Sequence, residues 1–195
     1  MIESTRQELD RRLRINEGER FTAYYDTANP PCLTIGVGFN LQRADAVTVG
    51  QVLKAAGIVC PWSLEAFKKL SLTQEQVDAL LDHDVPNYIA AARRSLVNDL
   101  FDTMTPARQI AITDMTYNLG EAGWLGFVTT RTLIESGQTC KNQGTSSAHD
   151  YFVQAGEHLA ASAWYSQVGD RAKRNVAMIV TGQLCSATGD GSDVS

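Results

Sequence analysis

Two carboxylates and one hydroxyl near the N-terminus have the types and the spacing of a hydrolytic site. Glu17 is followed at once by Gly18, which ends helices at little cost because it tolerates a left-handed conformation. Asp26 follows an aromatic run and Thr34 opens a second β-type run, so residues 13–38 are predicted to fold as helix, turn and hairpin. Glycoside hydrolysis needs two carboxyl groups in different surroundings, one to protonate the leaving oxygen and one to activate water or stabilise the cation. We therefore predict that Glu17 and Asp26 converge across a small concave space, with the Thr34 hydroxyl placed to hold the water.

Each of these residues also has an interpretation without catalysis. A Glu at a helix C-terminus is more often a solvated side chain than an acid catalyst, and an Asp before a Thr in a turn often accepts hydrogen bonds from the local backbone. Short motifs also carry a high false-positive risk when they are read singly. The order of the three residues and the sequence around them favour the catalytic interpretation.

The run LRINEGERFTAYYDT, with TIGVG behind it, resembles the phage-type, endolysin-like lysozymes of glycoside hydrolase family 24. That family has an α+β fold and muramidase activity, with a Glu, an Asp and a Thr that correspond to Glu17, Asp26 and Thr34. The resemblance implies hydrolysis, with inversion, of the β-1,4 bond between N-acetylmuramic acid and N-acetylglucosamine. The segment from Asp26 to Thr34 is two residues longer than in the family, although the spacing from Glu17 to Asp26 agrees. Phe39 stands where the family often has a histidine, and this replacement removes an ion pair that some relatives form with the residue matching Asp84.

The segments NLGEAGWLGF and AWYSQVGDRAKRNVAMIVTG carry the same resemblance in the second half of the chain. It implies that Asn118 and Thr129 hydrogen-bond the saccharide, and that Arg171 supports the site by lying against Glu17. From the residues alone, Asn118 and Thr129 are equally well surface polar groups, and Arg171 is equally well part of an exposed basic face.

The predicted elements give an α+β, lysozyme-like fold with a small β-hairpin lobe and a larger helical lobe joined by a long helix. A capping box at Thr73 opens this helix, which is expected to run to about Leu96 and to be interrupted or kinked at Pro86. We assign residues 1–182 to a single domain, whose parts are a small lobe at about 17–72, a linking helix at 73–96, and a helical lobe at 1–16 and 97–182.

Two stretches lack apolar periodicity. Residues 137–147 form a polar run punctuated by glycine, which we expect to be a flexible insertion near the mouth of the cleft. Residues 183–195 are low in apolar content and are predicted to form a disordered tail.

Composition argues against several classes of protein. A chain of 195 residues that is 44% hydrophobic can bury a core without metal or disulfide support. Its formal net charge of -5 argues against a nucleic-acid binder. The cysteines are scattered and no histidines have metal-ligand spacing, so we expect free thiols, no metal and no cofactor, and the even number of cysteines leaves a disulfide after export as the alternative. The four thiols are those of Cys32, Cys60, Cys140 and Cys185.

The N-terminal run MIESTRQELDRR lacks the apolar segment of a signal peptide, and no stretch has the roughly 20 apolar residues of a membrane span. We therefore expect synthesis in the cytoplasm, no membrane insertion, and action on the cell wall, in the periplasm or outside the cell, after release or export. The expected substrate is the glycan strands of peptidoglycan and the expected state is a monomer, with a holin, an export system or an immunity protein as partner. A phage lysis protein, a virion-associated enzyme and a secreted bacterial toxin all stay open.

Two alternatives to hydrolysis also stay open. The lengthened loop, Phe39 and the acidic charge fit a non-catalytic module that binds cell-wall glycan or serves in assembly while keeping the fold. A lytic transglycosylase also uses a Glu but yields an anhydro sugar, and in such an enzyme Asp26 would lack an obvious task.

Overall fold

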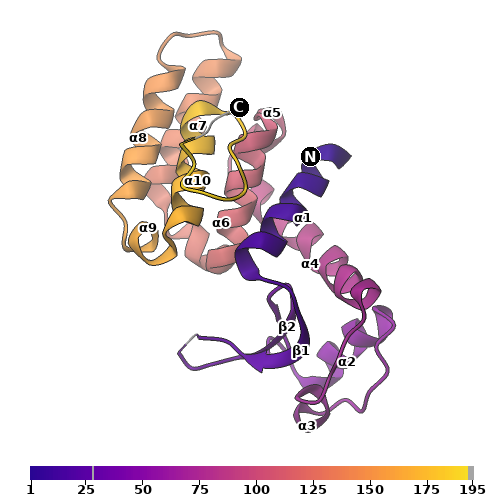
Figure 1. Cartoon of the computed structure of the whole chain (residues 1–195). Coiled ribbons are helices and arrows are strands. Elements are labelled where there is room, and N and C mark those ends of the chain that lie inside the picture. The colour runs from indigo at the N-terminus through magenta and orange to yellow at the C-terminus, as the bar shows by residue number, and fades with distance from the viewer. Residues whose placement is uncertain (28, 193–195) are drawn as a thin grey trace. The chain divides into compact units, whose positions relative to one another are not determined.

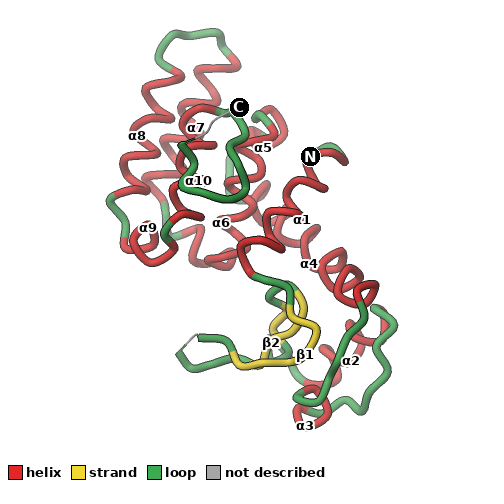
Figure 2. The backbone as a smooth tube through the Cα atoms, in the orientation of Figure 1, coloured by secondary structure: helices red, strands yellow, loops and turns green. Residues whose placement is uncertain are grey.

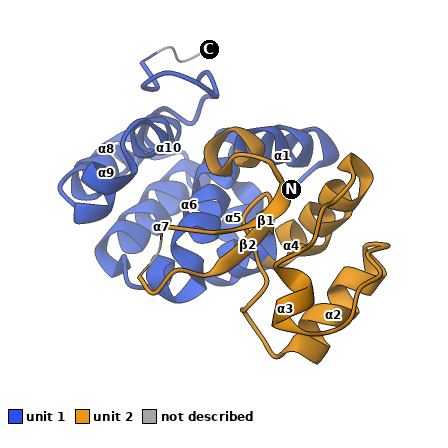
Figure 3. Cartoon of the chain, turned by 60° about the horizontal axis from the view of Figure 1, so that its bottom comes forward, with its two compact units in different colours: residues 1–12, 88–195 blue, residues 13–87 orange. Residues whose placement is uncertain are grey.

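The helices and strands of the chain divide between two compact units. The structure is a computed structural model that describes residues 1–27 and 29–192. Unit 1 comprises residues 1–12 and 88–195, and unit 2 comprises residues 13–87 (Figure 3). Helices α1 (Glu3–Glu17) and α4 (Gln74–Arg94) each cross a boundary, so unit 2 is an insertion in the sequence of unit 1. The predicted α+β fold, with many helices and one small sheet, is confirmed.

Unit 2 is built on a three-stranded antiparallel sheet (Figure 2). Its strands are β1 (Arg20–Tyr25), β2 (Leu33–Gly36) and β3 (Phe39–Asn40), in that order. The central strand β2 is buried at every residue. Helices α2 (Ala46–Ala55) and α3 (Leu64–Phe67) follow the sheet, and the core of the unit includes Leu33, Ile35, Phe39, Leu53, Phe67 and Val77.

The long helix predicted after Thr73 is confirmed as α4. The Thr73 N–H donates to Gln76 Oε1 at 3.0 Å, and the Gln76 N–H donates back to Thr73 Oγ1 at 3.4 Å, which are the two bonds of a capping box. The helix continues through Pro86 to Arg94. Pro86 therefore does not end the helix, although it lacks an N–H to donate to the preceding turn, and the expected kink stays a prediction.

Asp84 in unit 2 keeps a cationic partner although Phe39 replaces the histidine of the family. Arg43 Nη1 donates to Asp84 Oδ2 at 2.6 Å, and its guanidinium carbon lies 4.1 Å from the centre of the Phe39 ring. His83 Nδ1 lies 2.9 Å from the other carboxylate oxygen of Asp84, whose side chain is only 5% exposed. Phe39 itself cannot form the ion pair, as expected, but Arg43 supplies the positive charge for Asp84 and stacks on the Phe39 ring.

Unit 1 is helical and is built around α6, α7, α8 and α10. Helix α6 (Pro106–Leu125) changes direction at Gly120, which has a φ of +71° that favours glycine. Helices α7 (Val128–Asn142) and α8 (Ala148–Ala160) lie side by side, and α10 (Asp170–Thr181) packs on both α6 and α8 (Figure 1). The short helices α5 (Leu100–Thr103) and α9 (Ala163–Val168) complete the unit, and its core includes Ile110, Ala111, Met115, Trp124, Phe152 and Ile179.

The polar run at 137–147 is mostly the end of a helix rather than a flexible insertion. Helix α7 continues to Asn142, and only residues 143–147 connect it to α8. Gly137 lets the helices approach closely, because a Cβ added there would lie 3.1 Å from the Phe152 ring. Gln138 is buried and its amide donates to the carbonyl oxygen of Thr103 at 3.1 Å and to Asn142 Oδ1 at 2.8 Å. The prediction failed because this helix end packs through a glycine and a glutamine, which leave no apolar pattern.

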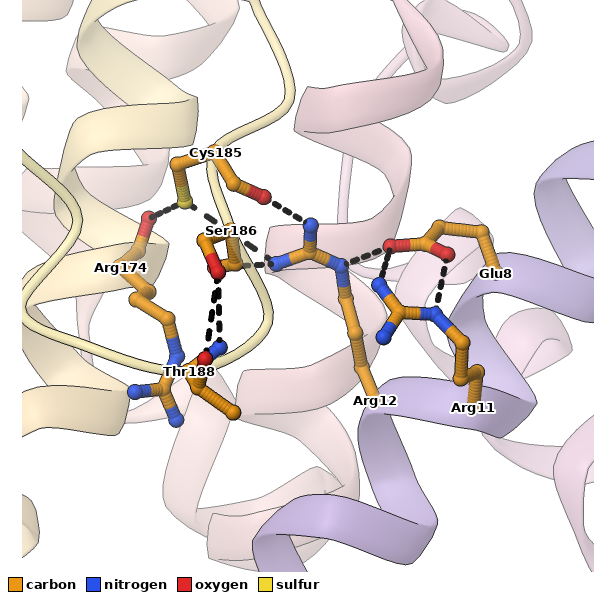
Figure 4. A network of polar contacts seen from close by, with 7 residues as sticks. All are labelled: Glu8, Arg11, Arg12, Arg174, Cys185, Ser186 and Thr188. Carbon is orange, nitrogen blue, oxygen red and sulfur yellow. Dashed lines mark hydrogen bonds and ion pairs between the residues drawn. The ribbon is translucent and has the colours of Figure 1, made fainter. Parts of the chain in front are cut away.

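Residues 183–192, which we call the C-terminal strap, pack on unit 1, whereas the sequence predicted a disordered tail. Arg12 is buried and donates to the carbonyl oxygens of Cys185 and Ser186 (Figure 4). Arg174 donates to the carbonyl oxygen of Gly189 at 2.6 Å. The strap is thus held by arginines that bind its backbone, so few apolar side chains are needed. Residues 193–195 of the expected tail lie outside the described residues.

Candidate active site

Glu17 is the last residue of α1, and Gly18 follows with a φ of +73°. This conformation is cheap for glycine and ends the helix, so the Glu17 side chain is carried at a helix terminus beside the turn into β1. The carboxylate is half-buried. The predicted helix end at Glu17 is confirmed.

Asp26 and Thr34 are brought together by the pairing of β1 with β2. The Asp26 N–H donates to the carbonyl oxygen of Cys32 at 3.0 Å, and the Cys32 N–H donates to Asp26 Oδ1 at 2.8 Å. The Thr34 hydroxyl lies 3.4 Å from Asp26 Oδ2 and 3.2 Å from the Cys32 carbonyl oxygen. The pairing of Asp26 with Cys32 closes the hairpin next to the Asp26–Thr34 contact.

Tyr24 is a further candidate for the site, which the sequence alone did not indicate. Burial raises the pKa of its phenol, and the negative charges of Glu17 and then Asp26 raise it further, while Arg20 opposes them. Tyr24 pairs with Thr34 across the sheet. It also precedes Asp26 by two residues, and side chains two residues apart along a strand point to the same face. This strand alternation was the signal that could have identified it. Tyr24 therefore supplies a neutral phenol whose pKa is raised by the charges of both carboxylates.

The predicted sugar-binding residues lie in unit 1. Asn118 is exposed, and its Oδ1 accepts a hydrogen bond from Trp164 Nε1 at 2.8 Å. Thr129 is exposed in the first turn of α7, beside the buried Thr130, whose hydroxyl lies 2.8 Å from His158 Nδ1. The saccharide contacts of Asn118 and Thr129 stay predictions.

Arg171 belongs to the core of unit 1 rather than to an exposed basic face. Its Nε and Nη2 donate to the two carboxylate oxygens of Asp114 at 2.9 and 3.0 Å. Asn175 Nδ2 donates to the same carboxylate at 2.6 Å. Asp114 lies among the apolar residues of α6, and a charged residue in such a position is itself a sequence signal of a buried ion pair. The expected contact of Arg171 with Glu17 stays a prediction.

Residues 1–27 and 29–192 contain neither a metal-binding cluster nor a membrane-spanning helix. No group of three or more His, Cys, Asp or Glu side chains in this range is placed to hold a metal ion. No helix within it is long and apolar enough to cross a membrane. The four cysteines are unbridged.

Known proteins resemble the chain over most of its length. A family model described as phage lysozyme matches residues 14–162. The pre-baseplate central spike protein Gp5 of Enterobacteria phage T4 is 26% identical over 178 residues, which cover 88% of this chain and 27% of that protein. The probable T4-type lysozyme 1 of Dictyostelium discoideum is 22% identical over 177 residues, which cover 88% of this chain and 93% of that protein. The chain thus spans about a quarter of the phage relative and nearly all of the Dictyostelium relative.

Proposed function

Because the chain belongs to the phage lysozyme family, we propose that it is a muramidase that hydrolyses the β-1,4 bond between N-acetylmuramic acid and N-acetylglucosamine in peptidoglycan. The proposal rests chiefly on one observation, the contact of Asp26 with Thr34 at 3.4 Å in a hairpin that follows directly after Glu17. The site of action is then the cell wall.

In this mechanism Glu17 is the general acid that gives its proton to the leaving glycosidic oxygen. Asp26 accepts a hydrogen bond from the attacking water and takes up its proton as the bond to the sugar forms. The Cys32 N–H fixes one carboxylate oxygen, so the other is held toward Thr34. The Thr34 hydroxyl is then placed to accept the second hydrogen of that water.

Tyr24 contributes a positioned phenol in the same mechanism. Its raised pKa keeps the hydroxyl protonated across the working range of pH, so it serves as a hydrogen-bond donor beside two carboxylates. We assign it a positioning role and no proton transfer.

Digestion of purified peptidoglycan tests the proposal. The wild type, Glu17→Gln, Asp26→Asn and a control, Glu157→Gln, are compared, because Glu157 is an exposed glutamate of α8. Mass spectrometry of the released fragments should find reducing N-acetylmuramic ends with the wild type and the control, and none with Glu17→Gln. Full activity of Glu17→Gln would contradict the assignment, and anhydro ends from the wild type would identify a transglycosylase.

A second candidate is a non-catalytic module that binds wall glycan within a larger assembly. The similarity to Gp5, which is described as a central spike protein, favours it. In that case the folded wild type would bind peptidoglycan in a sedimentation assay and release no fragments. Release of fragments by the wild type would rule this candidate out.

A further inference from the structure

A pocket in unit 1 gathers positive side chains outside the candidate active site. It has a volume of about 230 Å³ and is formed by residues of α6, α7, α8 and α10. In the described part of the chain, none of its three basic side chains forms an ion pair with a carboxylate. The residues that line it are Arg108, Lys141, Ala148, His149, Phe152 and Thr181.

Arg108 is the fixed part of this pocket. Its side chain is only 5% exposed, its Nε donates to the carbonyl oxygen of Ile179 at 2.8 Å, and its Nη2 donates to that of Val180 at 3.2 Å. The guanidinium carbon lies 3.5 Å from the centre of the Phe152 ring. Burial lowers the pKa of Arg108 to about 10, so the group is still a cation at neutral pH. The guanidinium is thereby held in one orientation before any ligand arrives.

Lys141 adds a second positive charge beside the first. Burial lowers the pKa of its ammonium group, and the positive charge of Arg108 lowers it further. Lys141 is exposed as a whole residue, and the closeness of its positive charge to that of Arg108 raises the free energy of the empty pocket. A bound anion would relieve this repulsion.

The N-terminus of α8 provides further donors. Ala148 and His149, the first two residues of that helix, both line the pocket, and the preceding Ser147 makes no side-chain cap. The first backbone N–H groups of a helix lack partners within it and carry partial positive charge. A helix N-terminus, the fixed Arg108 guanidinium and a second cation together favour an anion with several acceptor oxygens.

We propose that this pocket binds a phosphate group, either as the free ion or as an ester. A tetrahedral phosphate presents acceptor oxygens in several directions, which suits a guanidinium, an ammonium, an imidazole and backbone N–H groups that come from different helices. The chain has a formal net charge of -5, so its overall field does not attract anions and the binding has to be local.

Titration with inorganic phosphate at constant ionic strength tests the proposal. The thermal midpoint is followed in chloride buffer while phosphate replaces chloride up to about 20 mM, since a ligand of the folded state raises the midpoint. The wild type is compared with Lys141→Gln and with a control, Lys173→Gln, because Lys173 is exposed on α10 and paired with Asp170.

Phosphate should stabilise the wild type and the Lys173→Gln control alike. Its affinity for Lys141→Gln should fall about tenfold, as expected for the loss of one charge-assisted hydrogen bond. An equal response of the wild type and Lys141→Gln, or no response of the wild type, would overturn the proposal. Because Lys141 is not needed to hold α10, this variant avoids the folding defect that removal of Arg108 would cause.

A second titration with dimethyl phosphate separates the two sources of the ligand. Binding of both compounds would assign the pocket to the diester group of a polymer. Binding of inorganic phosphate alone would assign it to the free ion or to a terminal monoester. Chemical-shift changes confined to residues 141–149 and 181 would place either compound in the pocket, whereas changes only elsewhere would overturn the proposal.

Discussion

Asp26 in unit 2 and Asp114 in unit 1 are the same residue type in two different surroundings. Asp26 is half-buried at the end of a strand, with one bond of 2.8 Å from the backbone and a longer contact of 3.4 Å from Thr34. Asp114 is 1% exposed and accepts hydrogen bonds from Arg171 and Asn175 between 2.6 and 3.0 Å. A carboxylate that can reach solvent is suited to chemistry, whereas an enclosed one is suited to balancing a buried charge.

Asp114→Ala should give the largest loss of stability. It leaves the buried guanidinium of Arg171 without its carboxylate, which costs about 3–5 kcal/mol of unfolding free energy. Urea unfolding of this variant, with the exposed Asp150→Ala as control, measures the effect. A loss below about 1 kcal/mol would mean that Asp114 contributes no more to stability than an exposed carboxylate does.

Asp26→Asn should lower the activity and leave the stability nearly unchanged, in contrast to Asp114→Ala. Loss of a general base lowers the rate by about 10²–10⁴-fold. Its unfolding free energy should change by less than about 1 kcal/mol, because the Cys32 N–H still finds an oxygen. Peptidoglycan hydrolysis and urea unfolding are measured on the same sample, and a variant that is less stable but keeps wild-type activity would contradict the assignment.

Arg43→Gln tests the ion pair of Arg43 with Asp84, which is more exposed than the pair of Arg171 with Asp114. Asp84 is enclosed like Asp114, but the Arg43 side chain is 31% exposed and His83 also contacts the carboxylate. We expect a loss of about 1–3 kcal/mol, smaller than for Asp114→Ala. Equal losses in urea unfolding would mean that the exposure of the partner does not matter.

Thr34→Val removes the hydroxyl and keeps the shape of a buried side chain. The loss of its hydrogen bond should cost about 1 kcal/mol of unfolding free energy. The hydrolysis rate should fall about tenfold, because Asp26 keeps its bond to Cys32 while the water loses one partner. A steady-state assay with Thr34→Ser as the rescuing variant separates the lost hydroxyl from a packing defect.

Tyr24→Phe should produce the smallest effect, visible only at high pH. The pKa of Tyr24 is raised in the folded state, so its contribution to stability is present below the ordinary tyrosine pKa of about 10 and is lost as the pH rises through the folded value. The wild type should therefore lose more stability than Tyr24→Phe on going above about pH 10. Identical curves of thermal midpoint against pH would contradict the raised pKa.

The hairpin and α4 could be predicted because their signals are local in sequence. Glu17, Asp26 and Thr34 are delivered by one helix end and one pair of strands, so their order along the chain already specifies their neighbours. The pairing of Asp114 with Arg171 joins residues 57 apart, and no periodic pattern reports such a contact. The C-terminal strap escaped prediction because its contacts use backbone carbonyl oxygens, which every residue has.

The split of unit 1 into two segments sets an order of events during synthesis. The backbone partner of Arg12 at Cys185 is made 173 residues later than Arg12 itself. Unit 2, which is continuous from residue 13 to residue 87, can fold as soon as it leaves the ribosome, whereas residues 1–12 belong to a unit whose other segment begins only at residue 88. Throughout that interval Leu9, which is fully buried in the finished fold, stays uncovered. The start of α1 therefore exposes an apolar side chain until the second segment of its unit has been made.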